Sequence, residues 1–272
     1  MRFALCSEVY KLPIEETIRK VASIGFDGIE IAPFNVADSV DEVTDSRRRD
    51  VRRAAGDAGI EVIGLHWLLV SPKGLHLTTR DDLVRRRTAA YLVSLVHFCA
   101  DLGGKLLVLG SPRQRNLEPG DDVGSARGRA RDALRPAAAA CGERGVRLLL
   151  EPLHPAETTF LQTVEEARSL AAEIDPEHVG YILDCKAMSG MPLGIAGTIL
   201  EHGRDAGHFH ANEPDGLGPG MGDLDFRPIL GALRESGYQG WVSTEPFQYE
   251  PDADTVARAA LRTLREASMC DT

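Results

Sequence analysis

The sequence lacks most features of secreted, membrane-spanning and nucleic-acid-binding proteins. Its five cysteines are an odd number without a CxxC pair, a pattern that indicates a reduced, cytoplasmic setting rather than a disulfide framework. The apolar runs fall short of the roughly eighteen residues of a membrane span, and the N-terminal stretch lacks the apolar core of a signal peptide. The net charge of −10 opposes nucleic-acid binding, which depends on clustered Lys and Arg. We therefore expect a cytoplasmic protein that binds neither a membrane nor a nucleic acid.

What the sequence does contain is a regular alternation of short apolar runs with longer helical patterns. This is the sequence form of a parallel sheet. No shift in composition and no Ser/Gly linker divides the 272 residues, so we predict a single domain over residues 1–272, built as one (β/α)8 TIM barrel of the α/β class. The eight predicted strands cover residues 2–6, 27–32, 60–66, 105–110, 146–151, 179–184, 207–211 and 240–245.

The last four predicted strands each carry, at or near the C-terminal end, a residue that binds metals or moves protons. In a β/α barrel the C-terminal ends of the strands converge on one mouth, so these side chains can share one ion. A single buried carboxylate could instead form a salt bridge, but four such residues at the same end favour a metal site. The four residues are Glu151, Asp184, His210 and Glu245.

The donor set indicates which ion would bind. Three carboxylates and one imidazole, without a thiolate, favour Mn²⁺ or Mg²⁺, and Co²⁺ or Zn²⁺ could substitute. His208 and His210 are two residues apart on one strand, so both point to the same side. We expect His210, nearer the strand end, to be the ligand, and His208 to lie one layer deeper as a hydrogen-bonded core residue.

Around these residues the sequence resembles the sugar isomerase and epimerase barrels related to xylose isomerase, in particular the tagatose and psicose 3-epimerases. The resemblance covers the whole chain. It implies that Glu151, Asp184, His210 and Glu245 hold one divalent ion, that Glu151 and Glu245 also exchange substrate protons, and that the protein forms a dimer or tetramer. The matching stretches are GFDGIEI (25–31), LEPLHPAE (150–157), ILD (182–184), HFHANEPDGLGPGMGDLDF (208–226) and STEPF (243–247).

The two glutamates have a chemical rationale of their own. A C–H next to a carbonyl is weakly acidic, and a metal ion on the carbonyl and hydroxyl oxygens stabilises the enediolate that deprotonation forms. One carboxylate removes the proton and a carboxyl on the other face returns one. The sequence therefore predicts a metal-dependent isomerase or epimerase that acts on a small carbohydrate.

The sequence also departs from the ketose epimerases where those enzymes bind substrate. Their His three residues after the metal Asp is replaced here by Ala187, and PDGLGPG (214–220) lacks their Arg. Glu157 matches a substrate-contacting Glu. Lys186 and Arg113 could replace the missing contacts by binding a phosphate or carboxylate, which would make the substrate anionic.

Several of these assignments have alternatives. Lys186 and Arg113 could simply pair with rim carboxylates such as Glu118 or Glu157. His66 and Trp67 close the third predicted strand, where an imidazole can contact sugar hydroxyls and an indole can stack on the apolar face of a sugar. We expect both to bind substrate. Weaker candidates, with packing roles equally open, are His76, His154, Glu30 and Ser111.

Three other functions remain open at this point. The same one-metal site could serve a polyol dehydratase or a keto-glycoside lyase, because the proton abstraction is shared. A non-catalytic sugar-binding barrel would need no metal ligands. The apurinic endonucleases of the same superfamily bind three zinc ions, and Ala187 and GDLDF (222–226) stand where two of their histidine-containing elements would be. An endonuclease is therefore the remotest alternative.

Overall fold

The eight strands of the protein form one closed parallel barrel. The computed structural model describes residues 1–269. Each strand pairs in parallel with the next one in the chain, and β8 pairs with β1 to close the barrel. The predicted TIM barrel is confirmed. The strands are β1 (Arg2–Cys6), β2 (Gly28–Ile31), β3 (Glu61–Leu65), β4 (Leu106–Leu109), β5 (Arg147–Leu150), β6 (Val179–Asp184), β7 (His208–Ala211) and β8 (Trp241–Thr244).

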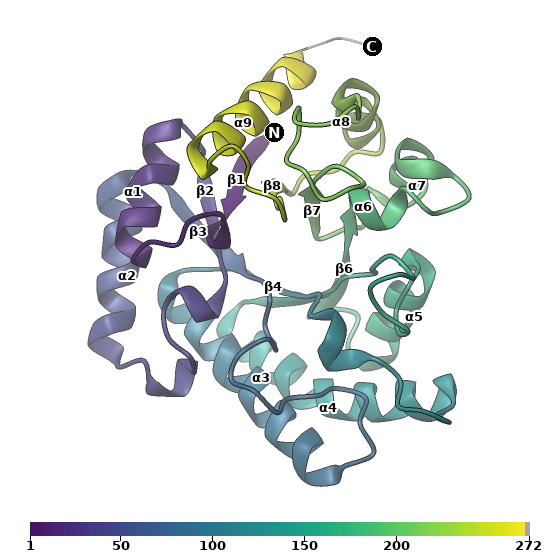
Figure 1. The fold of residues 1–272 in the computed structure, drawn as a ribbon. Helices are drawn as coiled ribbons and strands as arrows, with labels where there is room; N and C mark the ends of the chain where they lie inside the picture. The colour runs from purple at the N-terminus through teal and green to yellow at the C-terminus, as the bar shows by residue number, and fades with distance from the viewer. Residues whose placement is uncertain (270–272) are drawn as a thin grey trace.

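The helices surround the barrel on the outside (Figure 1). Many begin at a residue whose side chain accepts a hydrogen bond from the first turn, such as Asp81 before α3 and Thr163 before α5, as expected of N-caps. The long helices are α1 (Ile14–Ile24), α2 (Asp45–Ala58), α3 (Asp82–Leu102), α4 (Val123–Arg144), α5 (Val164–Ile174), α7 (Gly194–His202), α8 (Phe226–Glu235) and α9 (Ala253–Met269). Shorter helices are η1 (Ser7–Val9), η2 (Pro33–Asn35), η3 (Val40–Glu42), η4 (Pro112–Arg115) and α6 (Cys185–Met188).

Side chains on each strand alternate between the surrounding helices and the barrel interior. On β5, Leu148 and Leu150 belong to the large core beneath the helices, whereas Leu149 belongs to a small separate cluster with Val108 and Ile182. Glu151 follows two residues after Leu149, so it continues the inward series at the top of the barrel. The strand period thus brings the predicted site residues to the mouth.

Among the described helices, none combines the length and apolar character needed to cross a membrane. The four cysteines within residues 1–269 are all free and buried. Cys270 lies outside the described residues.

Candidate metal centre and active site

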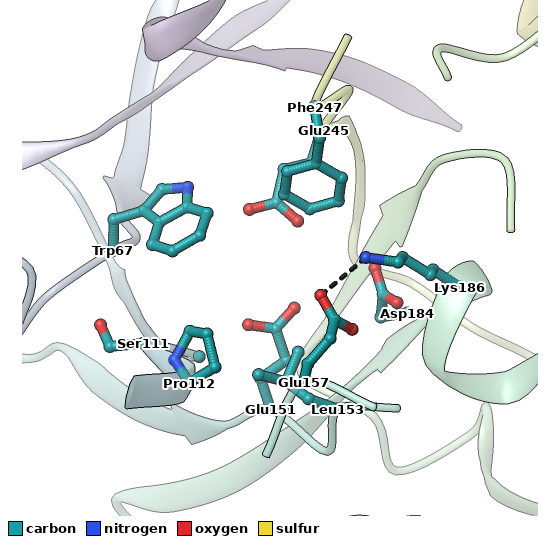
Figure 2. A pocket seen from close by; sticks show the side chains of 11 residues that line it. Trp67, Ser111, Pro112, Glu151, Leu153, Glu157, Asp184, Lys186, Glu245 and Phe247 are labelled. Atoms are coloured by element: carbon teal, nitrogen blue, oxygen red, sulfur yellow. Dashed lines mark hydrogen bonds and ion pairs between the residues drawn. The ribbon is translucent and has the colours of Figure 1, made fainter. Parts of the chain in front are cut away.

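A pocket opens at the C-terminal ends of the strands, with an empty volume of about 370 Å³. Glu151 and Glu245 face each other across it, and Trp67 and Phe247 form part of its wall (Figure 2). The other wall residues lie at the end of β6 and in the segments that follow β4, β5 and β6. The pocket is therefore a chamber with two opposed carboxylates and aromatic sides.

The four predicted metal ligands meet at the base of this pocket. Each of Glu151, Asp184, His210 and Glu245 is at most 5% exposed, and together they offer one ligand atom each within 4.8 Å of one another. The Nδ1 of His210 lies 3.1 Å from Oε1 of Glu151 and 3.0 Å from Oε2 of Glu245. One ring nitrogen cannot donate its single proton well to two carboxylates. A shared cation in their midst fits this arrangement.

Electrostatics in the site also favour a cation. Burial raises the pKa of Glu151 and of Asp184, and the neighbouring carboxylates raise it further. Burial would raise the pKa of Glu245 as well, but the charges and hydrogen bonds of His210 and His66 outweigh it and lower that pKa. Three carboxylates in so little space are costly unless positive charge compensates them.

Hydrogen bonds from a backbone amide, an Asn side chain and an Arg side chain fix the ligands from β5 and β6. Asp184 Oδ1 accepts a 2.7 Å hydrogen bond from the amide of Ala187, and its Oδ2 accepts one of 2.7 Å from Asn212 Nδ2. Arg115 is fully buried and donates to the carbonyl of Glu151 at 2.7 Å. A Cβ on Gly110 would come within 1.8 Å of Glu151 Oε2, so the carboxylate occupies the space that a side chain there would fill.

A carboxylate lies behind the histidine ligand. Glu30, from β2, has Oε2 2.9 Å from His208 Nε2, and both its oxygens lie 3.3 Å from His210 Nε2. His208 is fully buried one layer below His210, where we expected it. Glu30 fixes the His210 ring so that Nδ1 faces the other ligands, an arrangement typical of metal-binding histidines.

The structure places His66 and Trp67 differently. Trp67 lines the pocket, with a left-handed backbone φ of 54°. His66 is 1% exposed, does not line the pocket, and lies between Glu245 (Nδ1 to Oε1, 3.2 Å) and Glu8 (Nε2 to Oε2, 2.9 Å). Burial would lower the pKa of His66, but Glu8 and Glu245 outweigh it and raise that pKa to about 10. Glu8 was not among the residues predicted from the sequence.

The two predicted cations also differ in position. Lys186 lines the pocket and its Nζ pairs with Glu157 Oε1 at 2.6 Å (Figure 2), while lying 4.8 Å from the centre of the Phe247 ring. Arg113 is exposed on η4 and is not among the residues that line the pocket. Lys186 thus pairs with a rim carboxylate, which was the alternative to binding an anionic group of the substrate. Phe247 belongs to STEPF, so the motif that identified Glu245 could also have indicated it.

Comparison with known proteins places the chain in a family. A family model described as xylose isomerase-like TIM barrel matches residues 18–267. The chain belongs to this family. The probable ketose 3-epimerase of Synechocystis sp. is 27% identical over 258 residues, which cover 89% of this chain and 86% of that protein. The 3-dehydro-D-guloside 4-epimerase of Escherichia coli is 25% identical over 260 residues, which cover 93% and 94%.

Solved structures show the same fold. D-psicose 3-epimerase from Clostridium cellulolyticum H10, crystallised with D-tagatose, has a TM-score of 0.87 at 23% identity and covers 99% of this chain and 100% of its own. The 3-keto-D-glucoside 4-epimerase of E. coli has a TM-score of 0.84 at 23% identity and covers 98% and 99%. The curated relatives are named epimerases and isomerases, and the chain is an enzyme of this group.

Proposed function

We propose that this protein is a divalent-metal-dependent isomerase or epimerase of a sugar or sugar derivative, with Glu151 and Glu245 as its acid/base pair. The observation that carries the proposal is the pair of buried glutamates that face one pocket and share His210 Nδ1 as a neighbour at 3.1 and 3.0 Å. The names of the relatives, which include ketose 3-epimerases and a 3-dehydro-D-guloside 4-epimerase, support a substrate with a carbonyl group next to a hydroxyl-bearing carbon.

Each part of the pocket has a task in such a reaction. Glu151, Asp184, His210 and Glu245 would hold the ion, most suitably Mn²⁺ or Mg²⁺ for this oxygen-rich set. A bound ion would polarise the substrate carbonyl and favour negative charge on its oxygen. One glutamate removes the proton beside the carbonyl, and the other returns a proton from the opposite side. Trp67 and Phe247 cover the sugar and exclude water.

The pairing of Lys186 argues for a neutral substrate. Its ammonium group is held by Glu157 at 2.6 Å, and Arg113 is outside the pocket wall. This ion pair already offsets the charge of Lys186, and the Glu157 carboxylate would repel a phosphate or carboxylate of the substrate. We therefore propose a free or glycosylated keto sugar in place of the anionic sugar that the sequence first suggested.

Exchange of substrate hydrogen with solvent tests the proposal. Protein loaded with Mn²⁺ or Mg²⁺ is incubated in D₂O with ketoses, sugar phosphates and 3-keto glycosides, and NMR follows the carbon-bound hydrogens. We expect deuterium at the carbon beside the carbonyl, with the product otherwise equal in mass to the substrate, and no exchange with Glu151→Gln or Glu245→Gln. Exchange at the parent rate in both variants would refute the two-glutamate mechanism, and loss of water or aglycone would indicate the dehydratase or lyase instead.

We also propose that residues 1–272 form a single domain that works in the cytoplasm. The support is the continuous barrel from β1 to β8 and the free state of the cysteines within residues 1–269. A single unfolding transition that coincides in fluorescence and circular dichroism would agree with one domain. Two separate transitions would contradict it.

A further inference from the structure

A second group of metal-binding side chains lies beside Glu245, on the β1 and β3 side of the barrel. It consists of Cys6 at the end of β1, Glu8 on η1 and His66 after β3, and with Glu245 these residues offer ligand atoms within 4.8 Å of one another. Cys6 is fully buried, His66 is 1% exposed, and the Glu8 side chain is 10% exposed. Glu8 is therefore the member of the group nearest to solvent.

The polar atoms of this group lack the partners that buried atoms require. Within residues 1–269, neither carboxylate oxygen of Glu8 has a hydrogen-bond partner. The Nε2 atom of His66 has none either. Yet Nε2 and Glu8 Oε2 are only 2.9 Å apart. They are close but do not form a directed hydrogen bond. Two ligands at about 2.1 Å from a tetrahedrally bound ion are separated by about 3.4 Å, so an ion bound here would widen the 2.9 Å contact by about 0.5 Å.

The other nitrogen of His66 strengthens this argument. Nδ1 lies 3.2 Å from Glu245 Oε1. A divalent ion bound at Nε2 would take the place of the Nε2 proton between His66 and Glu8, while Nδ1 keeps its proton towards Glu245. Metal-binding histidines usually bind the ion through one ring nitrogen and donate the N–H of the other to a carboxylate or another acceptor. Glu245 would be that acceptor for His66.

We infer that Cys6 Sγ, the Glu8 carboxylate and His66 Nε2 form a second divalent-ion site that prefers zinc. A thiolate, an imidazole and a carboxylate suit Zn²⁺, whereas the all-oxygen-and-nitrogen set of the first site suits Mn²⁺ or Mg²⁺. A bound ion displaces the proton of the Cys6 thiol. The inference does not depend on the proposed sugar chemistry, because it concerns other side chains. Through His66, the second ion would hold Glu245 Oε1 in place.

Titration of the metal-free protein with Co²⁺ alone tests the second site. We expect two bound equivalents and a thiolate-to-cobalt charge-transfer band in the near ultraviolet. Cys6→Ser should remove the band and one equivalent. The matched control is Cys99→Ser, because Cys99 is equally buried but lies on α3 with its thiol near the carbonyl of Leu106. It should keep both equivalents and the band.

Two further variants separate the sites. Glu8→Gln should weaken the equivalent that carries the band at least tenfold, and it keeps the experiment informative if Cys6→Ser does not fold. Asp184→Asn should remove the other equivalent and leave the band, so failure of the first site is distinguishable from failure of the second. The inference would be overturned if the parent protein bound a single equivalent of Co²⁺ without the band, or if the band persisted in Cys6→Ser. His66 would then be a doubly protonated imidazolium held between the carboxylates of Glu8 and Glu245.

Discussion

The interior of the barrel has two unlike halves below the pocket. On β4, β5 and β6 the inward residues are Val108, Leu149 and Ile182, which form an apolar cluster. On β7, β8, β1 and β2 the inward positions hold a buried network of polar and sulfur-containing side chains. That network consists of His208, Ser243, Cys6 and Glu30.

This contrast shows how differently the metal ligands are supported. In the polar half, side chains hold the ligands: Glu30 contacts His210, and His66 contacts Glu245. In the apolar half, Glu151 and Asp184 stand on a hydrocarbon layer and are fixed mainly from the sides by amides and Arg115. Buried ionic groups seldom add net stability. We therefore expect the polar half to serve metal binding and the apolar half to serve folding.

The largest effect should come from changing a ligand that stands on the apolar half. Glu151→Gln removes a proton-transfer group but conserves its shape, so we expect kcat to fall about 10²- to 10⁴-fold. The free energy of unfolding should change little or rise, because a buried carboxylate with a raised pKa is removed. Steady-state kinetics and urea denaturation measure the two quantities. A kcat within threefold of the parent would exclude Glu151 as acid or base.

The apolar layer itself should matter for stability alone. Leu149→Ala leaves a cavity between Val108 and Ile182 and should lower the free energy of unfolding by about 2–5 kcal/mol. Affinity for Mn²⁺ in calorimetric titration should stay within a few-fold of the parent. If the metal affinity fell more than the stability, the division between the two halves would be wrong.

The polar half should show the opposite behaviour. Glu30→Gln keeps the size of the side chain but weakens its hold on His210, so we expect the affinity for Mn²⁺ to fall about 10- to 100-fold. Calorimetric titration gives the affinity. The Co²⁺ spectrum of the same variant should shift as well, since the His210 ring is less fixed. An unchanged affinity would mean that the position of His210 is set without Glu30.

The smallest effect is expected at the margin of the polar half. Ser243 contacts Cys6, with Oγ 3.5 Å from Sγ, and no hydrogen bond to the four ligands of the first site is found for its side chain within residues 1–269. Ser243→Ala should change the free energy of unfolding by less than about 1 kcal/mol and leave Mn²⁺ affinity unaltered. A loss as large as that of Glu30→Gln would show that the whole network, rather than the Glu30 contact, supports the metal.

The sequence was informative wherever strand periodicity decides the outcome. The ends of β1 and β6 agree with the predicted strands, and alternation alone put His208 below His210. It could not show that Trp67 lines the pocket while the neighbouring His66 is buried outside the pocket wall, because a strand-end position sets the depth of a residue but not which residues lie around it. Glu8 was missed for a similar reason: η1 is a single short turn without a periodic pattern.

Gly110 restricts which positions of the site can be varied in protein engineering. Since any side chain at the end of β4 would collide with Glu151, this position cannot be used to reshape the pocket, however close to the substrate it lies. Attempts to change specificity are better directed at the rim, where Lys186 and Glu157 are about a quarter exposed. Libraries that randomise the rim and keep Gly110 fixed should retain far more active members than libraries that include it.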